Sequence, residues 1–550
     1  MESTIAGVLL APVASLPRSH REVIQYHASL YEKGIQNGDF EPFVYPWGAL
    51  GALVVIVYLL IPHRNRPWLK NARFLAFAWI TAFAAFTIRY TRPKSPTASF
   101  GLGLISAWSV LWVGAILVVN DAQTDFQRIE RTGGVFRQGK KEKEDLDGTT
   151  VADFKNEDNI SLDGRNLNGH TEPQGHLGPS DRHGEFAWQP FPLTPFVERL
   201  DWVLDIFCNF RGVGWNWRTS SLAPPPKWVQ EQLRRNTSNP PKNSSRVHPG
   251  QTKVYPTRRE LLIANTKTLL IGYIQLDALI TLRNHDPYFW GLVDQPPPAY
   301  FPAIVTGNPV VLNMYRLAVS QFAIKWALET IFCMGPLFFS GLIGPSILGA
   351  RAEAWVYPET WGSYDIVLDR GLAGWWSGWW HQTFRFAFDQ PSKKLIEITG
   401  MNPKSPAVKG LQLVIAFGLS GFLHACGSYT CHGITRPLMG PIRFFLLQAV
   451  AVFAEVLLSQ AARHTGIQNY VPKWAMRTFT FTYVHFWFYH TAPLLCEDFA
   501  KGGVWLFEPI PISLFRGLGF GVEGDGWCCW STGFIRWYTG KHWWKGGIAF

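Results

Sequence analysis

The chain has 550 residues, of which 47% are hydrophobic and 15% aromatic, but only 17% are charged. Soluble domains carry about 25% charged residues. The composition therefore argues against a soluble multidomain protein, and it excludes collagen, a coiled coil and a chain that is disordered throughout. The net charge of +11 comes without any nucleic-acid-binding motif. The expected class is a membrane protein whose basic surface faces anionic lipid or an anionic soluble substrate.

Residues 1–120 contain three apolar segments that are long enough to cross most of a bilayer. They cover residues 45–62, 74–88 and 99–120. At ~1.5 Å per residue such helices match a hydrocarbon core of ~30 Å. The N-terminus carries Glu2 and no early Lys or Arg, so no cleaved signal peptide is expected.

A polar region, residues 121–195, follows these segments. It mixes charge, Gly and Asn with almost no aliphatic run, and such a sequence buries too little apolar area to offset its conformational entropy. We therefore expect a flexible loop. In residues 196–217, apolar positions recur at helical spacing, interrupted by the charges of Glu198, Asp201, Asp205 and Arg211. This pattern predicts an amphipathic helix in the membrane interface.

The apolar pattern resumes within residues 196–500, and an aromatic-rich C-terminal segment, residues 501–550, ends the chain. The candidate spans here are residues 261–282, 315–333, 335–348, 411–426, 444–462 and 479–495. Pro336 is expected to separate the second of these from the third. The predicted fold class is all-α, a multispanning transmembrane helical protein with about eight to ten spans.

His424 is the clearest ionisable residue inside an apolar segment. The sequence around it, FGLSGFLHACG, is otherwise apolar or small, and an ionisable group inside a membrane is costly enough to need a reason. Ser420, Gly421 and Gly427 would let a neighbouring helix or a ligand approach closely. On position alone, a core histidine bonded to a neighbouring helix explains His424 as well as a catalytic base does.

A second candidate site lies in the tryptophan-rich sequence WWSGWWHQTFR, residues 375–385. Trp380 precedes His381 and Gln382, and Arg385 follows His381 by four residues, so on a helix His381 and Arg385 would share a face. An aromatic belt at the membrane interface with an interfacial arginine would explain this composition. The functional alternative is a cationic, hydrogen-bonding wall for an anionic or carbonyl ligand.

Other patterns are less specific. His424, Cys426, Cys431 and His432 match no zinc spacing, so no metal is expected. The seven cysteines form no disulfide framework and are expected to be reduced thiols. Three asparagines fit the glycosylation sequon, which only a lumenal loop could use. They are Asn159, Asn236 and Asn243.

Two of these motifs together resemble the wax-synthase-like branch of the membrane-bound O-acyltransferases. They are WWHQTFR, residues 379–385, and FGLSGFLHACG, residues 417–427. The sequence RLDWVLDIFCNFRGVGWNW, residues 199–217, resembles a segment that is common in fungal members. The resemblance extends over residues 195–500, and the paired motifs are specific for the family but not for its substrate.

The resemblance implies a helical membrane fold in which an acyl-CoA and an alcohol meet at a buried histidine. It assigns catalysis to His424, with His381 as the second polar residue. The residues expected to contact substrate are Trp380, Gln382, Arg385 and Ser420. Acetyl-CoA or another acyl-CoA would be the co-substrate, with no bound cofactor. The other partners would be a lipophilic alcohol and the lipid bilayer, with no nucleic acid.

Several functions fit these motifs. The resemblance of residues 199–217 to fungal members favours acetylation of a hydroxyl on a terpenoid or meroterpenoid secondary metabolite. The expected location is the endoplasmic reticulum membrane. The rival in the same family makes wax or sterol esters from long-chain acyl-CoA. A rival of another class is a proton-coupled transporter that uses His424, Lys267 and Asp277 as a relay, and a non-enzymatic membrane scaffold is a third. Acyl chain length and acceptor depend on packing that periodicity does not supply.

Overall fold

The computed structural model describes residues 17–63, 65–133, 184–237, 241, 252–466, 469–530, 535–540 and 542–549. Across these residues the protein is helical, and its strands are confined to three small sheets. The predicted all-α membrane class is confirmed at this level. The middle of the predicted flexible loop, residues 134–183, lies outside the described residues, as do Asn159 and Asn243.

Five helices in the described part of the chain are long and apolar enough to cross a membrane. They are α4–α5 (Pro67–Asn71 and Arg73–Tyr90), α6–η3 (Pro96–Val113 and Gly114–Val119), α12–η6 (Pro309–Pro336 and Leu337–Ile343), α16 (Pro406–Thr430) and η10–α17 (Leu438–Ile442 and Arg443–His464). A shorter apolar helix is formed by η2 and α3 (Trp47–Ala49 and Leu50–Leu60). The number of eight to ten spans stays a prediction.

Pro336 does not separate two helices, contrary to the sequence-based prediction. The helix α12 continues through it into the π-helical segment η6, and together they form one span of 35 residues. Proline lacks the N–H that an α-helix interior would use. Pro336 lies where the winding changes from α to π, a change of hydrogen-bond register that lets the helical path go on.

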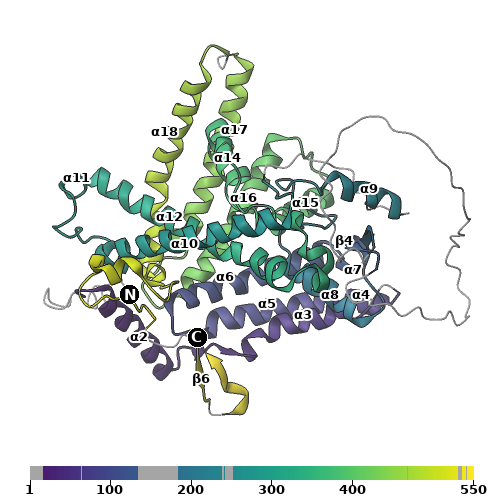
Figure 1. Ribbon diagram of the computed structural model, residues 1–550, viewed down its shortest axis with the longest axis horizontal. Coiled ribbons are helices and arrows are strands. Elements are labelled where there is room, and N and C mark those ends of the chain that lie inside the picture. Colours follow the sequence, from purple (N-terminus) through teal and green to yellow (C-terminus); the bar gives the residue numbers. More distant parts are fainter. Residues whose placement is uncertain are drawn as a thin grey trace, which may run out of the picture.

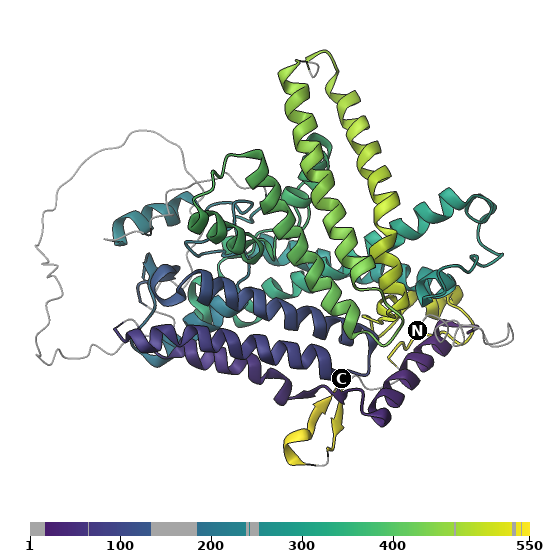
Figure 2. The same ribbon diagram turned by 180° about the vertical axis from the view of Figure 1, so that it is seen from behind.

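The helices are arranged between two ends of the molecule. Figure 1 shows α3, α5 and α6 side by side, with α8 (Phe196–Cys208) and α9 (Lys227–Asn236) at one end and α2 (His20–Asn37) with the C-terminal strands at the other. We call these the α9 end and the α2 end. The hairpin of α17 and α18 (Lys473–Thr491) stands out from the body, as seen from behind in Figure 2.

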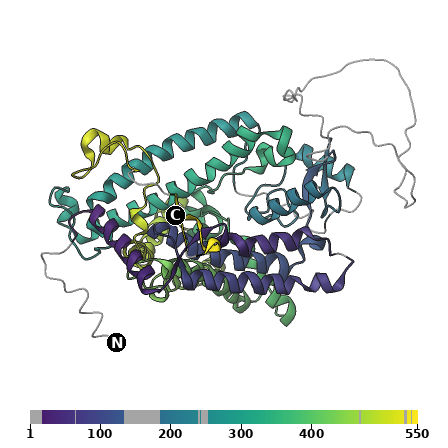
Figure 3. The ribbon, with the colours of Figure 1, turned by 90° about the horizontal axis from the view of Figure 1, so that it is seen from below.

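The remaining helical segments connect these long helices. They are α7 (Ala122–Asp125), α10 (Arg258–His285), η5 (Pro287–Trp290), α11 (Ala303–Thr306), α13 (Pro345–Leu348), η7 (Gly349–Ala352), η8 (Ala354–Val356), α14 (Asp365–Gly374), η9 (Trp375–Trp379), α15 (Arg385–Thr399), α19 (Pro493–Lys501), η12 (Val504–Leu506), η13 (Arg516–Phe520) and η14 (Trp543–Lys545). Seen from below in Figure 3, α10 runs along the side of the body opposite to α3 and α5.

Three small sheets close the two ends. At the α2 end, β1 (Glu41–Pro42) pairs in parallel with β3 (Thr91–Arg92), and β7 (Gly547–Ala549) pairs antiparallel with β2 (Val44–Tyr45) and β6 (Arg536–Tyr538). At the α9 end, β4 (Arg128–Arg131) pairs antiparallel with β5 (Phe186–Gln189). Both flanks of the predicted loop 121–195 are therefore strands, because Ile129 and Phe186 are buried in a small apolar cluster of their own.

The largest apolar cluster joins α6, α8, α15 and α16 through aromatic side chains. The ring of Trp217 lies 4.3 Å from that of Phe386, which connects the 199–217 segment to the tryptophan-rich motif. Gly103 of α6 allows close helix packing, because a Cβ there would lie 2.2 Å from the Cys426 carbonyl oxygen. This cluster therefore joins parts of all three segments of the resemblance, namely residues 199–217, the start of α15 and α16 near Leu423.

The helix α8 buries charged side chains as well as apolar ones, and its place in the membrane interface stays a prediction. Asp201 is buried, while Phe196, Val197 and Leu204 are exposed. The reason is Arg128 of β4, which is 1% exposed and whose Nη2 lies 2.6 Å from Asp201 Oδ2, with Asp205 Oδ2 3.2 Å from Nη1. A buried guanidinium draws the carboxylates toward the interior because it needs counter-charges there.

This ion-pair cluster generates a stability prediction. Arg128→Met removes the buried cation between the carboxylates of Glu130, Asp201 and Asp205, and breaking a buried pair in this way costs about 3–5 kcal/mol. We expect a large fall in the melting temperature of the detergent-solubilised protein. Arg235→Met is the matched control, because Arg235 pairs with Glu185 on the surface, where an ion pair contributes about 0–1 kcal/mol. Equal melting temperatures for the two variants would contradict the assignment.

Candidate active site

His424 lies on the inner part of α16, between aromatic side chains. The ring of Phe445 from α17 is 4.7 Å from the imidazole, and the ring of Phe100 from α6 is 6.4 Å away. Gly427 allows this packing, because a Cβ there would lie 2.7 Å from the Phe100 ring. The His424 side chain is partly buried, and these two rings cover part of it.

The two nitrogens of His424 have different surroundings. Nδ1 lies 2.9 Å from the backbone carbonyl oxygen of Ser420, one turn earlier in the same helix. A carbonyl can only accept, so Nδ1 carries the hydrogen, and in a neutral imidazole Nε2 keeps its lone pair. Among the described residues Nε2 has no hydrogen-bond partner. Ser420 thus orients the imidazole through its carbonyl group.

The tryptophan-rich motif is not a regular helix. Gly371 has φ +60°, and a Cβ there would come within 2 Å of Tyr483 Oη and Glu455 Oε1. The Glu455 carboxylate accepts hydrogen bonds from the N–H groups of Leu372 (2.9 Å) and Ala373 (2.7 Å), where the helix resumes. The chain then forms the π-helical segment η9, which ends in extended backbone at Trp380.

His381 and Arg385 therefore do not share a helix face, contrary to the sequence-based prediction. His381 lies in the turn between η9 and α15, and α15 begins only at Arg385. The prediction assumed regular helical spacing, and the π-helix with its extended exit removes that spacing. The orientation of the His381 side chain is therefore set by this turn and not by the helix α15.

Gln382 and Arg385 hold this turn together. The amide nitrogen of Gln382, which is 5% exposed, donates to the carbonyl oxygens of Trp376 (3.0 Å) and Trp380 (2.5 Å). Its amide oxygen accepts from Arg385 Nη1 at 3.0 Å, and the same Nη1 is 3.1 Å from the Ser377 carbonyl. Both ends of the Gln382 amide are thus occupied by the protein itself.

The imidazole of His381 is surrounded by aromatic rings. Its ring centroid lies 5.2 Å from Trp380, 5.6 Å from Phe384, 6.0 Å from Trp361 and 6.4 Å from Phe332 of α12. Its Nδ1 is buried and has no hydrogen-bond partner among the described residues. A buried polar atom left without a partner is costly, so this atom is a candidate contact for a bound substrate.

Burial, together with the charges of His424 and Arg211, lowers the pKa of His381 to about 3. His381 lies outside the five spanning helices, and it is neutral at physiological pH. His424 and Arg211 contribute to this shift, so both lie within electrostatic range of His381. That the two histidines form one catalytic site stays a prediction.

Arg211 is a site residue that the sequence reasoning missed. Its guanidinium donates to the carbonyl oxygens of Glu359 and Pro358, each at 3.0 Å. Arg211 belongs to the 199–217 segment, where the sequence pattern predicts only a charge that interrupts the apolar positions. The signal that could have found it is a single arginine between Phe210 and Gly212 in an aromatic-rich motif of the resemblance.

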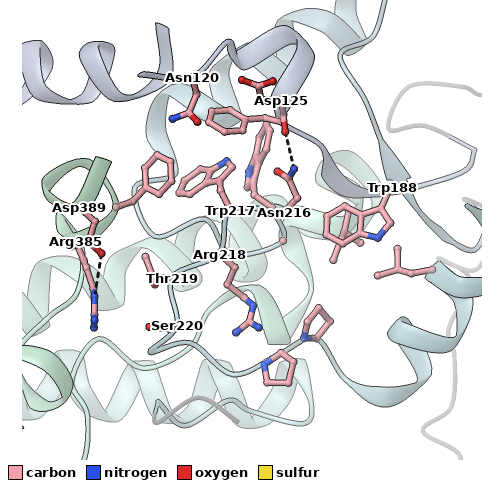
Figure 4. Close-up of a pocket in the computed structure, with 18 of the residues that line it drawn as sticks. Asn120, Asp125, Trp188, Asn216, Trp217, Arg218, Thr219, Ser220, Arg385 and Asp389 are labelled. Atoms are coloured by element: carbon pink, nitrogen blue, oxygen red, sulfur yellow. Dashed lines mark hydrogen bonds and ion pairs between the residues drawn. The ribbon is translucent and has the colours of Figure 1, made fainter. Parts of the chain in front are cut away.

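A cavity of about 860 Å³ opens beside the tryptophan-rich turn, at the α9 end. Figure 4 shows Trp217 and Arg218 beside it from one loop, with Arg385 and Asp389 of α15 at another side. Four cationic side chains and two carboxylates line it, together with three tryptophans. They are Arg218, Arg234, Arg385, Lys393, Asp125, Asp389, Trp188, Trp215 and Trp217. The lining includes Arg385 but neither His381 nor His424.

The groups invoked for a proton relay or a metal site do not come together. Asp277 is fully buried and caps the segment that follows Ser513, accepting from the N–H groups of Leu514 (2.6 Å) and Phe515 (3.2 Å). Lys267 is exposed and ten residues earlier in α10, about 15 Å along the axis. No group of three His, Cys, Asp or Glu side chains in the described ranges could hold a metal ion.

Comparison with known proteins agrees with the motifs. Residues 357–447 match the membrane bound O-acyl transferase family, and this stretch contains both histidines. The chain is 25% identical to the O-mevalon transferase yanI of Aspergillus niger over 51% of this chain and 58% of that relative. It is 27% identical to macI of Penicillium terrestre, of the same printed name, over 47% of this chain and 53% of that relative.

The acetyltransferase ple2 of Rhodocybe pseudopiperita is 24% identical, over 58% of this chain and 73% of that relative. The chain thus aligns with somewhat more than half the length of the first two curated relatives. No solved structure gives a significant match. The resemblance to membrane-bound O-acyltransferases, first seen in the two motifs, is confirmed.

The buried, neutral state of His381 predicts how stability depends on pH. Its folded pKa of about 3 lies below the 6.5 of an unperturbed histidine. The unfolded chain therefore binds a proton below pH 6.5 that the folded chain does not, and stability falls as the pH is lowered toward 3. The loss is about 1.4 kcal/mol per pH unit. In His381→Gln we expect melting temperatures between pH 6.5 and 4 to fall less steeply, and an unchanged slope would contradict burial.

Proposed function

We propose that the chain is an acyl-CoA-dependent O-acyltransferase that transfers an acetyl group to a hydroxyl of a lipophilic terpenoid or meroterpenoid. The observation that carries the proposal is His424, whose Nε2 is free to accept a proton among aromatic side chains and within electrostatic range of neutral His381. Support comes from the family match over residues 357–447 and from relatives named as acetyltransferases.

The proposed transfer is direct. Nε2 of His424 takes the proton of the acceptor hydroxyl while its oxygen attacks the thioester carbonyl carbon, and general-base help of this kind contributes ~10²–10⁴-fold. The C–S bond then breaks, the acyl group stays on the acceptor oxygen, and the proton passes from His424 to the leaving CoA thiolate. A nitrogen of His381 that carries hydrogen would donate to the developing oxyanion, a contribution of ~10²–10³-fold.

The other predicted site residues receive supporting roles in this proposal. Ser420 fixes the tautomer of His424 through its carbonyl, and the ring of Trp380 packs beside His381, where it would contact the substrate. Gln382 and Arg385 keep the turn that presents His381. The charge of Arg211 near His381 would favour the negative charge that develops on the thioester oxygen.

The cavity beside Arg385 is the proposed site for the nucleotide part of CoA. A nucleotide with three phosphates needs cationic donors and an aromatic face, and the lining offers four cations and three tryptophans. Arg385 belongs both to this lining and to the His381 turn. Bound CoA could therefore extend from the cavity toward the two histidines.

This assignment implies a membrane orientation. Acyl-CoA is a soluble cytosolic molecule, so the α9 end would face the cytosol of an endoplasmic reticulum membrane. Asn236, whose amide already donates to Glu185 Oε2 at 2.8 Å, lies at the end of α9 beside this cavity. On the proposed orientation this sequon stays unglycosylated, since N-glycans are added in the lumen.

The function is tested with purified protein, a set of lipophilic alcohols, and radiolabelled acetyl-CoA or palmitoyl-CoA. We expect acyl transfer from acetyl-CoA, and a fall of at least about 100-fold in kcat for His424→Gln at an unchanged melting temperature. His464→Gln, on the exposed end of α17, is the control. Turnover with palmitoyl-CoA alone would sink the acetyl assignment, and full activity of His424→Gln would sink the catalytic one.

The nucleotide site is tested by charge removal. Arg218→Gln and Lys393→Gln should each raise KM for acetyl-CoA about 10-fold with kcat little changed, because a charge-assisted hydrogen bond contributes about 1.5–3 kcal/mol. Inhibition by adenosine 3′,5′-bisphosphate should weaken in parallel. Lys394→Gln is the matched control, since Lys394 pairs with Glu397 outside the cavity lining. A KM that rises equally in the control would refute the site.

A further inference from the structure

Three polar side chains lie at the centre of the spanning helix α12. This span has 35 residues, and Gln321, Lys325 and Glu329 occupy its middle third. Charged side chains near the middle of a membrane span are costly, and they generally face the bundle interior or a polar cavity. None of the three takes part in the transfer step proposed above.

The spacing of these residues places them on one face of the helix. Gln321, Lys325 and Glu329 follow each other at intervals of four, and Phe332 comes three residues after Glu329, so all four lie along one side. The ring of Phe332 is 6.4 Å from His381. At ~1.5 Å per residue, Glu329 lies ~5 Å and Gln321 ~16 Å from Phe332 along the helix axis. We call Gln321, Lys325 and Glu329 the α12 polar face.

The protein itself does not use up the hydrogen-bonding groups of this face. Lys325 forms an ion pair with Glu329, and its ammonium lies 4.1 Å from the ring centre of its neighbour Trp326. Neither has another hydrogen-bond partner among the described residues, and both side chains are 25% exposed. The amide nitrogen of Gln321 is buried and without a partner.

The alternative is that Lys325 and Glu329 only neutralise each other while they face lipid. That arrangement has a high desolvation cost, and it leaves the buried amide nitrogen of Gln321 without a hydrogen-bond partner.

The polar face runs away from the proposed CoA cavity. Just beyond α12, the Ser340 carbonyl accepts from Arg258 at the start of α10 (2.7 Å). Eleven residues later Arg351 pairs with Asp201 of α8. The C-terminal end of α12 therefore lies toward the α9 end. Gln321 is therefore farther from the α9 end than His381. On its neighbouring side, α12 packs Val319 into the cluster that contains Phe445, the ring next to His424.

We propose that the α12 polar face binds a second oxygen function, a hydroxyl or a carbonyl, on the acceptor alcohol. Lys325 would donate to that oxygen, and Glu329 would accept from a hydroxyl, while the reacting hydroxyl sits at His424. The acceptor is then an oxygenated terpenoid rather than a simple long-chain alcohol or a sterol with one hydroxyl. This inference rests on the proposed acyltransferase function and specifies its acceptor class.

Two matched alcohol pairs test the inference. Lupeol and betulin share one triterpenoid skeleton and differ by a second hydroxyl, and dodecan-1-ol differs from dodecane-1,12-diol in the same way. We expect at least one diol to be acetylated with kcat/KM about 10-fold or more above its mono-ol. The double variant Lys325→Met/Glu329→Gln removes both charges together at similar volume. It should lose that preference while the mono-ol rate and KM for acetyl-CoA stay within about 3-fold.

The control is Lys394→Met/Glu397→Gln, which makes the same change in a surface pair of α15 and should keep the preference. A wild-type enzyme that acetylates mono-ols as well as diols, or a double variant that keeps the wild-type preference, would overturn the inference and leave the acyltransferase assignment standing. Folded enzyme that acetylates none of the four alcohols would count against the proposed function itself. The two failures are thereby distinguishable.

Discussion

The hydrogen bond from Nδ1 of His424 to the Ser420 carbonyl decides which nitrogen can act as a base. A neutral imidazole has one N–H and one lone pair, and in an apolar interior neither can be supplied by water. Because the Nδ1 hydrogen is tied to the helix of its own residue, the lone pair on Nε2 points away from the Ser420 carbonyl. Everything proposed for the reaction depends on that orientation being held by backbone rather than by a titratable partner.

The second histidine is delivered by irregular backbone. A break at Gly371, a π-helical segment and an extended residue place His381 where a continuous helix would not. Such backbone leaves carbonyls and N–H groups unpaired, and these are satisfied by Glu455 and Gln382. Irregular backbone inside a membrane protein is tolerated only where protein groups or a cavity satisfy it, and here the side chains of Glu455 and Gln382 supply the partners.

The molecule separates the two sides of the proposed reaction along its length. Cations and tryptophans gather in the cavity at the α9 end, next to Arg385. The α12 polar face extends from the level of His381 in the opposite direction. A water-soluble, anionic donor and a lipophilic, oxygenated acceptor would thus enter from different sides and meet at the histidines. This arrangement suits direct transfer, since neither substrate has to leave before the other arrives.

Local sequence determined which segments are apolar helices and that His424 lies inside one, because hydropathy and the small residues around it act over one or two turns. Tertiary contacts decided the rest. Asp201 turns inward toward Arg128, more than seventy positions earlier, and Arg351, far later in the chain. His381 leaves the helix face of Arg385 because η9 ends in extended backbone at Trp380, a path that the Gln382 side chain stabilises. The position of Lys325 and Glu329 relative to the site follows only from the contact between the rings of Phe332 and His381. Periodicity predicts which residues share a face of a helix, but the groups that pack against each face come from distant parts of the chain.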